Sequence, residues 1–255
     1  MSYTVDAVSK AMELLFLVAE HPGLGVTELA KRSGNTKARA FRLLGTLEES
    51  GLVKRKEPLA TYSLGYRALF LGVAAQGQVQ LSQLGQSLLP AIGETCGESV
   101  LITIREGTET LCVAWWDAPH AVRVHSEMSA RRPLYVGASS KLLLAYAPEN
   151  IQEIVLHEDR KRYTPSTIVG RTQLKQAIKK IRELGHSISY GEKSADTVAM
   201  AVPIQDARGD VVACLSMTAP VSRMPDTRLP DCLDLLKKGA QRFSLELGYI
   251  PRNTI

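Results

Sequence analysis

The first fifty residues contain three short stretches in which apolar residues recur at helical spacing, each ended by residues that break helices. His21-Pro22-Gly23 ends the first stretch, because proline lacks a backbone donor and glycine favours a turn. Gly34-Asn35 separates the second stretch from the third, and both residue types tolerate positive φ. The spacing therefore predicts helices over residues 5–20, 26–33 and 36–50, the last two joined by a tight turn.

Two short segments with the composition of strands follow the third stretch. Residues 52–55 and 61–64 predict a pair of strands joined by a turn around Pro58. Three helices followed by a two-stranded hairpin make a winged helix-turn-helix. In that arrangement the third helix lies in the major groove of DNA and the wing contacts the backbone or the minor groove.

Positive charge is concentrated in this N-terminal segment. The whole chain has a formal net charge of +5, whereas residues 31–56 contain eight Lys or Arg and only two acidic residues. Such a patch predicts a polyanionic partner, with a solvated surface of incidental charges as the alternative. We expect DNA contacts from the third helix and the wing, through Thr36, Lys37, Arg39, Arg42, Lys54, Arg55 and Lys56.

These basic side chains have different predicted roles. Lys37 and Arg39 are placed to pair with guanine O6 and N7, whereas the wing residues would reach phosphates or the minor groove. Arg42 is predicted to be either a phosphate contact or an ion-pair partner packed beneath the helix. A helix-turn-helix used only for protein association is the alternative for the whole domain, and the presence of basic residues on both helix and wing favours DNA.

Length and composition predict two domains of a cytoplasmic protein. The 255 residues exceed the roughly 150 of one typical domain, and no apolar run approaches the roughly 18 residues of a membrane-spanning helix. Asp6 and Glu13 lie where a signal peptide would be uncharged. The cysteines show no C-x-x-C spacing, which is typical of reduced thiols, and they are Cys96, Cys112, Cys214 and Cys232.

Beyond the hairpin the pattern predicts two helices and then an α+β domain with a central antiparallel sheet. A connecting helix over residues 66–75, broken at 76–78, precedes a helix over residues 81–92. Dimerisation and packing against the chain's own C-terminal domain are equal alternatives for the connecting helix. Strands are expected at residues 100–105, 110–116, 122–125, 186–190, 198–205 and 211–218, and helices at 139–147, 171–184 and 229–247. The predicted domains are residues 1–65 and 81–255, with residues 66–80 as a linker helix.

Several short motifs resemble those of IclR-type transcriptional regulators. In the N-terminal half they are Ala11-Met12-Glu13-Leu14-Leu15, Glu28-Leu29-Ala30, Arg42-Leu43-Leu44-x-x-Leu47-Glu48-x-x-Gly51 and Tyr62-Ser63-Leu64-Gly65. In the C-terminal half they are Arg132-Pro133-Leu134, Ser140-Lys141-x-Leu143-Leu144-Ala145, Tyr163-Thr164-x-x-Thr167-Ile168, Ile181-Arg182-x-x-Gly185, Gly191-Glu192 and Ala201-Val202-Pro203-Ile204. The resemblance covers nearly the whole chain. It implies a GAF-like effector-binding domain, assembly as dimers or dimers of dimers, and no cofactor.

Two departures from that family pattern lie on the surface expected to contact DNA. Ala38 and Arg39 occupy positions where relatives usually have Ser or Thr early in the recognition helix. The wing turn, Lys56-Glu57-Pro58-Leu59-Ala60, lacks the usual glycine. The operator sequence of a relative is therefore not expected to apply to this chain.

The resemblance also implies a ligand site beside the helix that follows Pro133-Leu134. Carried over by position, its residues are Ala138, Ser139, Ser189 or Tyr190, Ala199, Ser216 and Thr218. Ser139 and Ser140 are expected to cap that helix, whose free N–H groups attract anions. Ser216 and Thr218 are two residues apart on a strand and share a face. These features predict a small carboxylate as effector, with capping and packing as the alternative role of the hydroxyls.

Signatures of catalysis are weak. Cys112 and Cys214 lie in apolar segments, and no motif joins them to His125, His157 or His186. The run His157-Glu158-Asp159 lacks a second ligand pair for a metal and is expected in a solvated loop. We therefore predict a ligand-responsive regulator, with neither catalysis nor a metal, that represses transcription until a small organic acid binds. The alternatives are an activator and a small-molecule enzyme with a regulatory DNA-binding domain.

Overall fold

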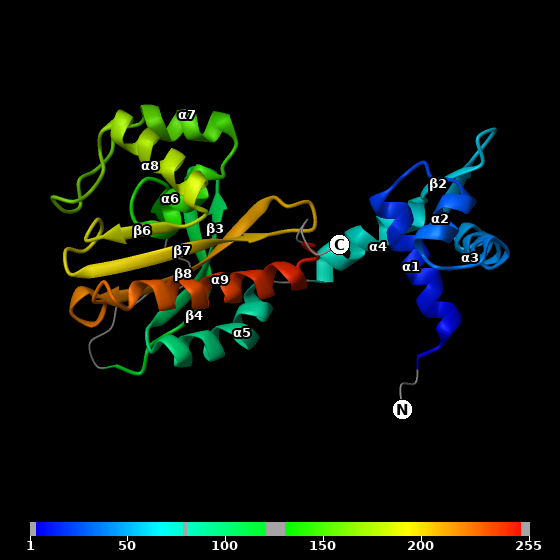
Figure 1. Cartoon of the computed structure of the whole chain (residues 1–255). Helices are drawn as coiled ribbons and strands as arrows, with labels where there is room; N and C mark the ends of the chain where they lie inside the picture. Colours follow the sequence, from blue (N-terminus) through cyan, green and yellow to red (C-terminus); the bar gives the residue numbers. More distant parts are fainter. Residues whose placement is uncertain (1–3, 79–80, 121–130, 251–255) are drawn as a thin grey trace. The chain divides into compact units, whose positions relative to one another are not determined.

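The computed structural model describes residues 4–78, 81–120 and 131–250 (Figure 1). The chain divides into two compact units, Met1–Gln78 and Val79–Ile255. Each unit has a hydrophobic core of its own, and we describe the two separately.

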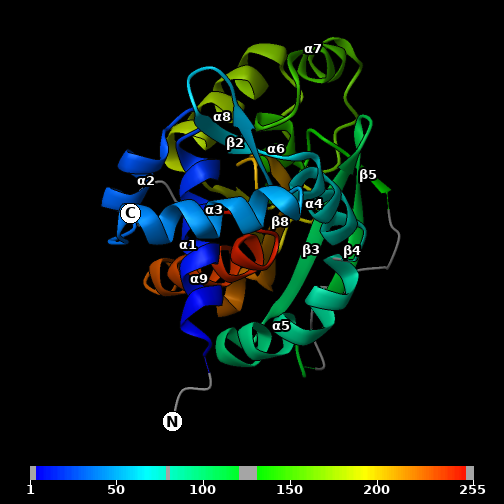
Figure 2. The same cartoon turned by 90° about the vertical axis from the view of Figure 1, so that its right-hand side faces the viewer.

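The N-terminal unit is a winged helix-turn-helix, as the sequence predicted (Figure 2). Its order is α1 (Asp6–Glu20), α2 (Val26–Arg32), α3 (Lys37–Glu49), β1 (Val53–Lys56), β2 (Thr61–Leu64) and α4 (Tyr66–Gln78). The two strands pair antiparallel, with Val53 opposite Leu64. The three helices and the hairpin enclose one small core, formed by Leu14, Val18, Leu29, Ala30, Ala40, Leu44, Leu47, Val53 and Tyr62.

Two glycines fix the junction where α3, the hairpin and α4 meet. Gly51 follows α3 with a φ of +72°, a left-handed conformation that side chains with a Cβ rarely adopt. Gly65 lies so close to Gly51 that a Cβ on Gly65 would be 2.2 Å from the Gly51 carbonyl oxygen. The end of the recognition helix and the end of the wing are therefore held against each other by backbone contact.

The predicted break after residue 75 is wrong, because α4 continues to Gln78. A single glycine in a helix interior costs only about 1 kcal/mol relative to alanine, and the glutamines on either side of Gly77 are good helix formers.

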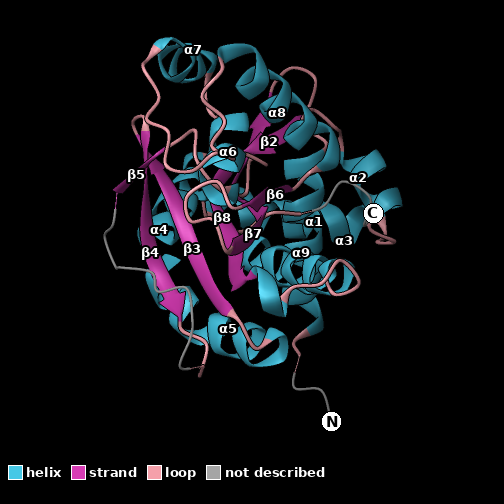
Figure 3. Cartoon of the chain, turned by 90° about the vertical axis from the view of Figure 1, so that its left-hand side faces the viewer, coloured by secondary structure: helices cyan, strands magenta, loops and turns pink. Residues whose placement is uncertain are grey.

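The C-terminal unit contains a six-stranded antiparallel sheet in the order β5-β4-β3-β8-β7-β6 (Figure 3). The strands are β3 (Ser99–Glu106), β4 (Glu109–Trp116), β5 (Arg131–Pro133), β6 (Ser187–Tyr190), β7 (Thr197–Gln205) and β8 (Val211–Pro220). The helices are α5 (Leu81–Cys96), α6 (Ala138–Ala145), α7 (Glu149–His157), α8 (Arg171–Leu184) and α9 (Leu229–Glu246), with a 3-10 turn, η1, at Val221–Arg223. The predicted α+β class with a central antiparallel sheet is confirmed.

Helices cover both faces of the sheet, with α5 and α9 on one face and α6, α7 and α8 on the other (Figures 1 and 3). Strand alternation decides which face each residue serves. On β8, Leu215 and Met217 belong to the core under α5 and α9, whereas Cys214 packs towards α6. Trp116 lies on the α5 side, where a Cβ on Gly93 would meet its ring.

The sequence prediction missed α7 and β5. No helix was predicted between residues 147 and 171, but Pro148 occupies the N-cap of α7. Proline is tolerated at helix starts because the first N–H groups of a helix have no acceptor there. His157 is consequently the last residue of a helix rather than part of a loop. The strand predicted at residues 122–125 lies outside the described residues.

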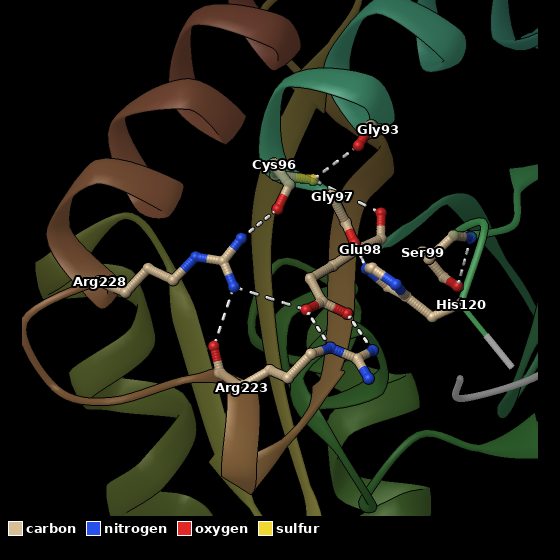
Figure 4. Close-up of polar contacts among 9 residues, drawn as sticks. Gly93, Cys96, Gly97, Glu98, Ser99, His120, Arg223 and Arg228 are labelled. Atoms are coloured by element: carbon tan, nitrogen blue, oxygen red, sulfur yellow. Dashed lines mark hydrogen bonds and ion pairs between the residues drawn. The ribbon is translucent and has the colours of Figure 1, made fainter. Parts of the chain in front are cut away.

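A buried carboxylate joins the start of β3 to the segment between β8 and α9 (Figure 4). Glu98 is 1% exposed, and it accepts hydrogen bonds of 2.7 Å from both Nε and Nη2 of Arg223. Arg228 donates to the carbonyl oxygens of Cys96 and Arg223 and lies 3.5 Å from the Glu98 carboxylate. Charge-assisted bidentate pairs of this kind fix geometry strongly. The cluster therefore anchors α9 against the sheet, on the side of the fold away from α6.

Candidate nucleic-acid interface and ligand cavity

The first two turns of α3 present a surface with mixed character. Lys37, Ala38, Phe41 and Arg42 are exposed, whereas Ala40 on the opposite side is fully buried. No acidic side chain in the described ranges pairs with Arg42, so the alternative of an ion-pair partner beneath the helix is wrong. The exposed face of α3 therefore presents two cations and one aromatic ring to an external partner.

Thr36 and Arg39 serve the local structure of α3. Thr36 is the N-cap, and its Oγ1 accepts a hydrogen bond of 3.3 Å from the backbone N–H of Arg39. The Arg39 guanidinium forms an ion pair with Asp6 at the start of α1. This contact lowers the pKa of the Asp6 carboxyl, because the hydrogen bond and the positive charge of Arg39 favour its ionised form. Arg39 must exchange this partner if it is to pair with a base.

The three basic residues of the wing do not share one face. Alternation along β1 exposes Lys54 and Lys56, whereas Arg55 is half-buried on the other side of the hairpin. Arg55 lies 3.2 Å from Glu57, and its backbone N–H donates to the Glu48 carboxylate on α3 at 3.3 Å. Lys54 and Lys56 are therefore the wing cations that point to solvent, and Arg55 connects the wing to α3.

A cavity of about 260 Å³ lies on the α6 side of the central sheet. Six of the positions carried over from the family resemblance line it, namely Ala138, Ser139, Ser189, Ala199, Ser216 and Thr218. Ser216 and Thr218 share a face of β8 as predicted. Hydroxyl groups also reach the cavity from β3 and β4, at Thr103 and Thr110. Residues far apart in the sequence thus converge on one cavity whose lining includes several hydroxyl groups.

Tyr190 does not line this cavity. It follows Ser189 on β6, and successive residues of a strand point to opposite faces, so only Ser189 faces α6. Tyr190 lines a separate groove along the edge of the sheet, together with Lys180 and Leu184 of α8. Of the two alternatives left by the sequence, the structure places Ser189 in the cavity.

The start of α6 differs in one respect from the sequence prediction. Gly137, with a φ of +86°, occupies the N-cap, and Ser139 and Ser140 lie inside the first turn without a capping hydrogen bond from their side chains. The capping role expected for both serines is therefore wrong. The first N–H groups of the helix have no acceptor within it, and Gly137, Ala138, Ser139 and Ser140 all border the cavity.

Three charged residues of the cavity lining were missed as site residues. Arg132 enters from β5, and Glu192 and Lys193 follow β6. Arg132 is half-buried and pairs with no carboxylate in the parts of the chain that are described. Its neighbour Arg131 points outwards and lies 2.5 Å from Glu106. The sequence signal that could have identified Arg132 was the pair of arginines before Pro133. Because successive residues of a strand point to opposite faces, only one of the two can point inward.

Glu192 is neutralised by protein groups rather than left to a ligand. Its carboxylate pairs with Lys141 of α6 and accepts a hydrogen bond of 3.1 Å from the Gly137 N–H. The side chains of Lys141 and Glu192 are 5% and 7% exposed. Because Lys141 cancels the charge of Glu192, the guanidinium of Arg132 remains as a positive charge in the lining without a carboxylate partner among the described residues.

The buried thiols are poorly suited to act as nucleophiles. Burial raises the pKa of Cys214 to about 12 and also raises the pKa of Cys112, which lines the cavity. A reactive cysteine requires a lowered pKa. His157 lies on α7 and is exposed, with its Nδ1 2.7 Å from the Glu153 carbonyl oxygen.

Within the described ranges of the chain, no group of three or more His, Cys, Asp or Glu is arranged to hold a metal ion. None of the helices in those ranges is both long and apolar enough to cross a membrane.

Comparisons with known proteins match both units. The model of the bacterial transcriptional regulator IclR C-terminal domain matches residues 73–245, and the model of the IclR helix-turn-helix domain matches residues 7–57. The transcriptional regulator KipR of Bacillus subtilis is 28% identical over 95% of this chain and 97% of its own length. The transcriptional repressor AllR of Klebsiella pneumoniae is 28% identical over 83% of this chain and 78% of its own length. The crystal structure of an IclR-type regulator from Silicibacter sp. TM1040 superposes with a TM-score of 0.88 at 25% identity, covering 97% of this chain and 98% of that one.

Proposed function

This chain belongs to the IclR family of DNA-binding transcriptional regulators, and from that premise we propose that it is a repressor whose operator binding is controlled by a small organic acid. Several relatives, AllR among them, are named as repressors. The observation that carries the proposal is the cavity on the α6 side of the sheet, which is lined by both the half-buried Arg132 and the first residues of α6.

The proposed DNA contacts come from the exposed part of the winged helix-turn-helix. Lys37 and Arg42 on α3 are positioned for base edges or phosphates, and Lys54 and Lys56 for the backbone beside the wing. Thr36 caps α3, whereas Arg39 and Arg55 would contact DNA only after leaving their acidic partners. These seven residues form the proposed interface.

We propose a homodimer, or a dimer of dimers, as the DNA-binding form. On α4 the side chains of Tyr66, Leu69 and Phe70 are 85%, 64% and 70% exposed. Large apolar side chains gathered on one helix mark an interaction surface, since water does not solvate them favourably. A second copy of the chain covering α4 would pair two winged helices on the two halves of an operator.

The chemistry of the cavity supports a small carboxylate as the effector. The guanidinium of Arg132 attracts an anion, free N–H groups at a helix start bind it, and the hydroxyls of Ser216 and Thr218 donate hydrogen bonds. Leu101, Val136 and Ala199 supply apolar surface for the remainder of the molecule. The volume of about 260 Å³ lies just below the roughly 300–1,000 Å³ of typical ligand pockets, which favours a small molecule.

Ligand binding would control DNA binding by linkage. An effector that binds one arrangement of the paired winged helices more tightly than another shifts the population towards that arrangement. Operator affinity then changes by the same coupling free energy, typically about 1–3 kcal/mol.

Arg132→Gln is the direct test of the cavity, with Arg131→Gln as its matched control. Small carboxylates and their amide analogues are screened by thermal unfolding of the full-length protein, and a carboxylate that raises the unfolding midpoint is then titrated by calorimetry. Arg132→Gln is expected to abolish the stabilisation, because an anion would lose its guanidinium partner, whereas Arg131 is exposed and points away. Equal loss in both variants, or stabilisation by amides alone, would contradict a carboxylate site.

Regulation is tested on the DNA upstream of the chain's own gene. Specific binding over random competitor, with affinity falling steeply as salt rises, is expected of a protein that contacts several phosphates. The stabilising carboxylate should weaken that binding in the wild type and leave it unchanged in Arg132→Gln. Strengthened binding would instead identify the ligand as a co-repressor or the protein as an activator.

A further inference from the structure

Phe41 is an exposed aromatic residue on the recognition helix. Its side chain is 52% exposed, and it belongs to none of the apolar clusters formed by the described residues. It lies three residues after Ala38 and beside Arg42 on the outer face of α3, whereas Ala40 and Leu44 face the core. Packing within the N-terminal unit therefore does not account for a phenylalanine at this position.

Packing within the N-terminal unit does not account for Gly45 either, which lies one turn further along α3. A Cβ on Gly45 would meet no heavy atom within 4 Å, so alanine would fit without any rearrangement. Glycine in a helix interior is less favourable than alanine. The interior of the fold therefore does not require a glycine here. We infer that the missing side chain leaves room on the outer surface of α3 for a partner that approaches the helix.

Charge indicates which kind of partner this is. Phe41 lies between Lys37 and Arg42, and the exposed wing cations Lys54 and Lys56 belong to the same unit. A positively charged surface fits the phosphates of duplex DNA. Within the major groove the apolar group that bases offer is the C5-methyl of thymine, and phenylalanine is among the side chains that contact it.

We infer that Phe41 packs against a thymine methyl group and makes this chain select thymine at one position in each half of its operator. The inference rests on the proposed placement of α3 in the major groove. Because no hydrogen bond is involved, the selectivity depends on the methyl group alone and is lost when uracil replaces thymine.

The experiment begins with the full-length protein and a pool of random duplex DNA. Cycles of binding select a preferred duplex, which is then synthesised with thymine and again with deoxyuridine at every thymine position. Dissociation constants for both duplexes are measured for the wild type, Phe41→Ala, Phe41→Leu and two controls. Phe16→Ala removes an equally exposed phenylalanine from α1, and Lys54→Ala removes a charge from the wing.

The wild type is expected to bind the thymine duplex about fourfold more tightly per methyl contacted, which corresponds to the burial of one such group. Phe41→Ala should bring that ratio close to one, and Phe41→Leu should retain part of it. Phe16→Ala should leave the ratio unchanged, and Lys54→Ala should weaken both duplexes equally. Single deoxyuridine substitutions then locate the contacted base pair.

Two results would overturn the inference in different ways. A wild-type preference for thymine that persists in Phe41→Ala would assign methyl recognition to another residue, with the proposed DNA contact intact. A selected duplex bound equally with thymine and uracil would remove methyl recognition altogether. If no duplex is selected and none binds even at low salt, the proposed placement of α3 fails first, and the inference fails with it.

Discussion

In the N-terminal unit four cations of the proposed interface, Lys37, Arg42, Lys54 and Lys56, are exposed, whereas in the C-terminal unit several polar side chains in and beside the cavity are buried. Lys37 and Arg42 lie on the outside of α3, above a core to which they contribute nothing. Ser216 and Glu192 of the cavity lining are buried by contrast, as is Lys141, which pairs with Glu192. Surface substitutions rarely change stability by more than about 0.5 kcal/mol, whereas unpaired buried charges are very costly. Binding and stability should therefore be separable in the first unit and coupled in the second.

The largest expected effect is that of Lys141→Met, which breaks the buried pair with Glu192. The variant should lose about 3–5 kcal/mol of unfolding free energy, because a carboxylate would remain buried without its cation. Urea unfolding followed by tryptophan fluorescence measures this in the C-terminal unit specifically, since Trp115 and Trp116 are the chain's two tryptophans.

Two variants test the cause of that loss. Lys180→Met removes an exposed lysine from α8 and should change stability by less than about 0.5 kcal/mol. The double variant Lys141→Met with Glu192→Leu should recover most of the loss, since an apolar pair replaces an ion pair of similar volume. If Lys141→Met alone were as stable as the wild type, the buried charges would not be coupled to folding. The proposed difference between the two units would then be wrong.

Arg42→Ala should instead weaken DNA binding and leave the stability of the protein nearly unchanged. We expect operator affinity to fall by about 1–3 kcal/mol, because a base or phosphate contact is lost. The unfolding midpoint should stay close to that of the wild type, since Arg42 is exposed and unpaired within the described ranges. Arg208→Ala, which removes an exposed arginine from the C-terminal unit, is the control and should bind DNA normally. A large stability loss in Arg42→Ala would contradict the proposed separation.

Alkaline pH should destabilise the C-terminal unit through its buried thiols. The pKa of Cys214 is about 12 in the folded protein against an ordinary value of 9.0, so between these values the unfolded chain loses a proton that the folded chain keeps. Unfolding is then favoured, and stability falls as pH rises by up to about 1.4 kcal/mol per pH unit.

Urea unfolding from pH 8 to 10.5 should show a shallower decline in Cys214→Ala than in the wild type. The remaining three cysteines lie in the same unit and also have raised pKa values, so the variant retains part of the decline. Identical slopes in both proteins would mean that Cys214 is accessible to hydroxide in the folded state.

The two units also differ in how well their sequences predicted them. On α3 the helical spacing of the apolar residues and the cluster of basic residues each indicated the recognition helix, because both signals are local. The strands of the sheet other than β5 were predicted from the local residue pattern, and alternation also placed Ser216 and Thr218 on one face.

What the sequence did not provide were the contacts between distant segments. The pairs Asp6–Arg39 and Lys141–Glu192 join residues 33 and 51 positions apart, and no local pattern indicates either of them. The inward turn of Arg132 depends on the pairing of β5 with β4, a three-residue contact at the sheet edge. The prediction that Ser139 and Ser140 cap α6 failed for a related reason, because the positive φ of Gly137 sets where that helix begins.

The smallest expected effect concerns the ion pair between Asp6, at the start of α1, and Arg39 of α3. Asp6→Asn should raise DNA affinity by a factor on the order of a few, because exposed ion pairs are weak and Arg39 no longer has to leave a carboxylate to reach DNA. Glu13→Gln, which removes another exposed carboxylate from α1, is the matched control and should leave affinity nearly unchanged. Lower affinity in Asp6→Asn alone would show that Asp6 orients Arg39 for DNA rather than withholding it. In that case the N-terminal unit, like the cavity, would depend on paired charges that the fold holds in place.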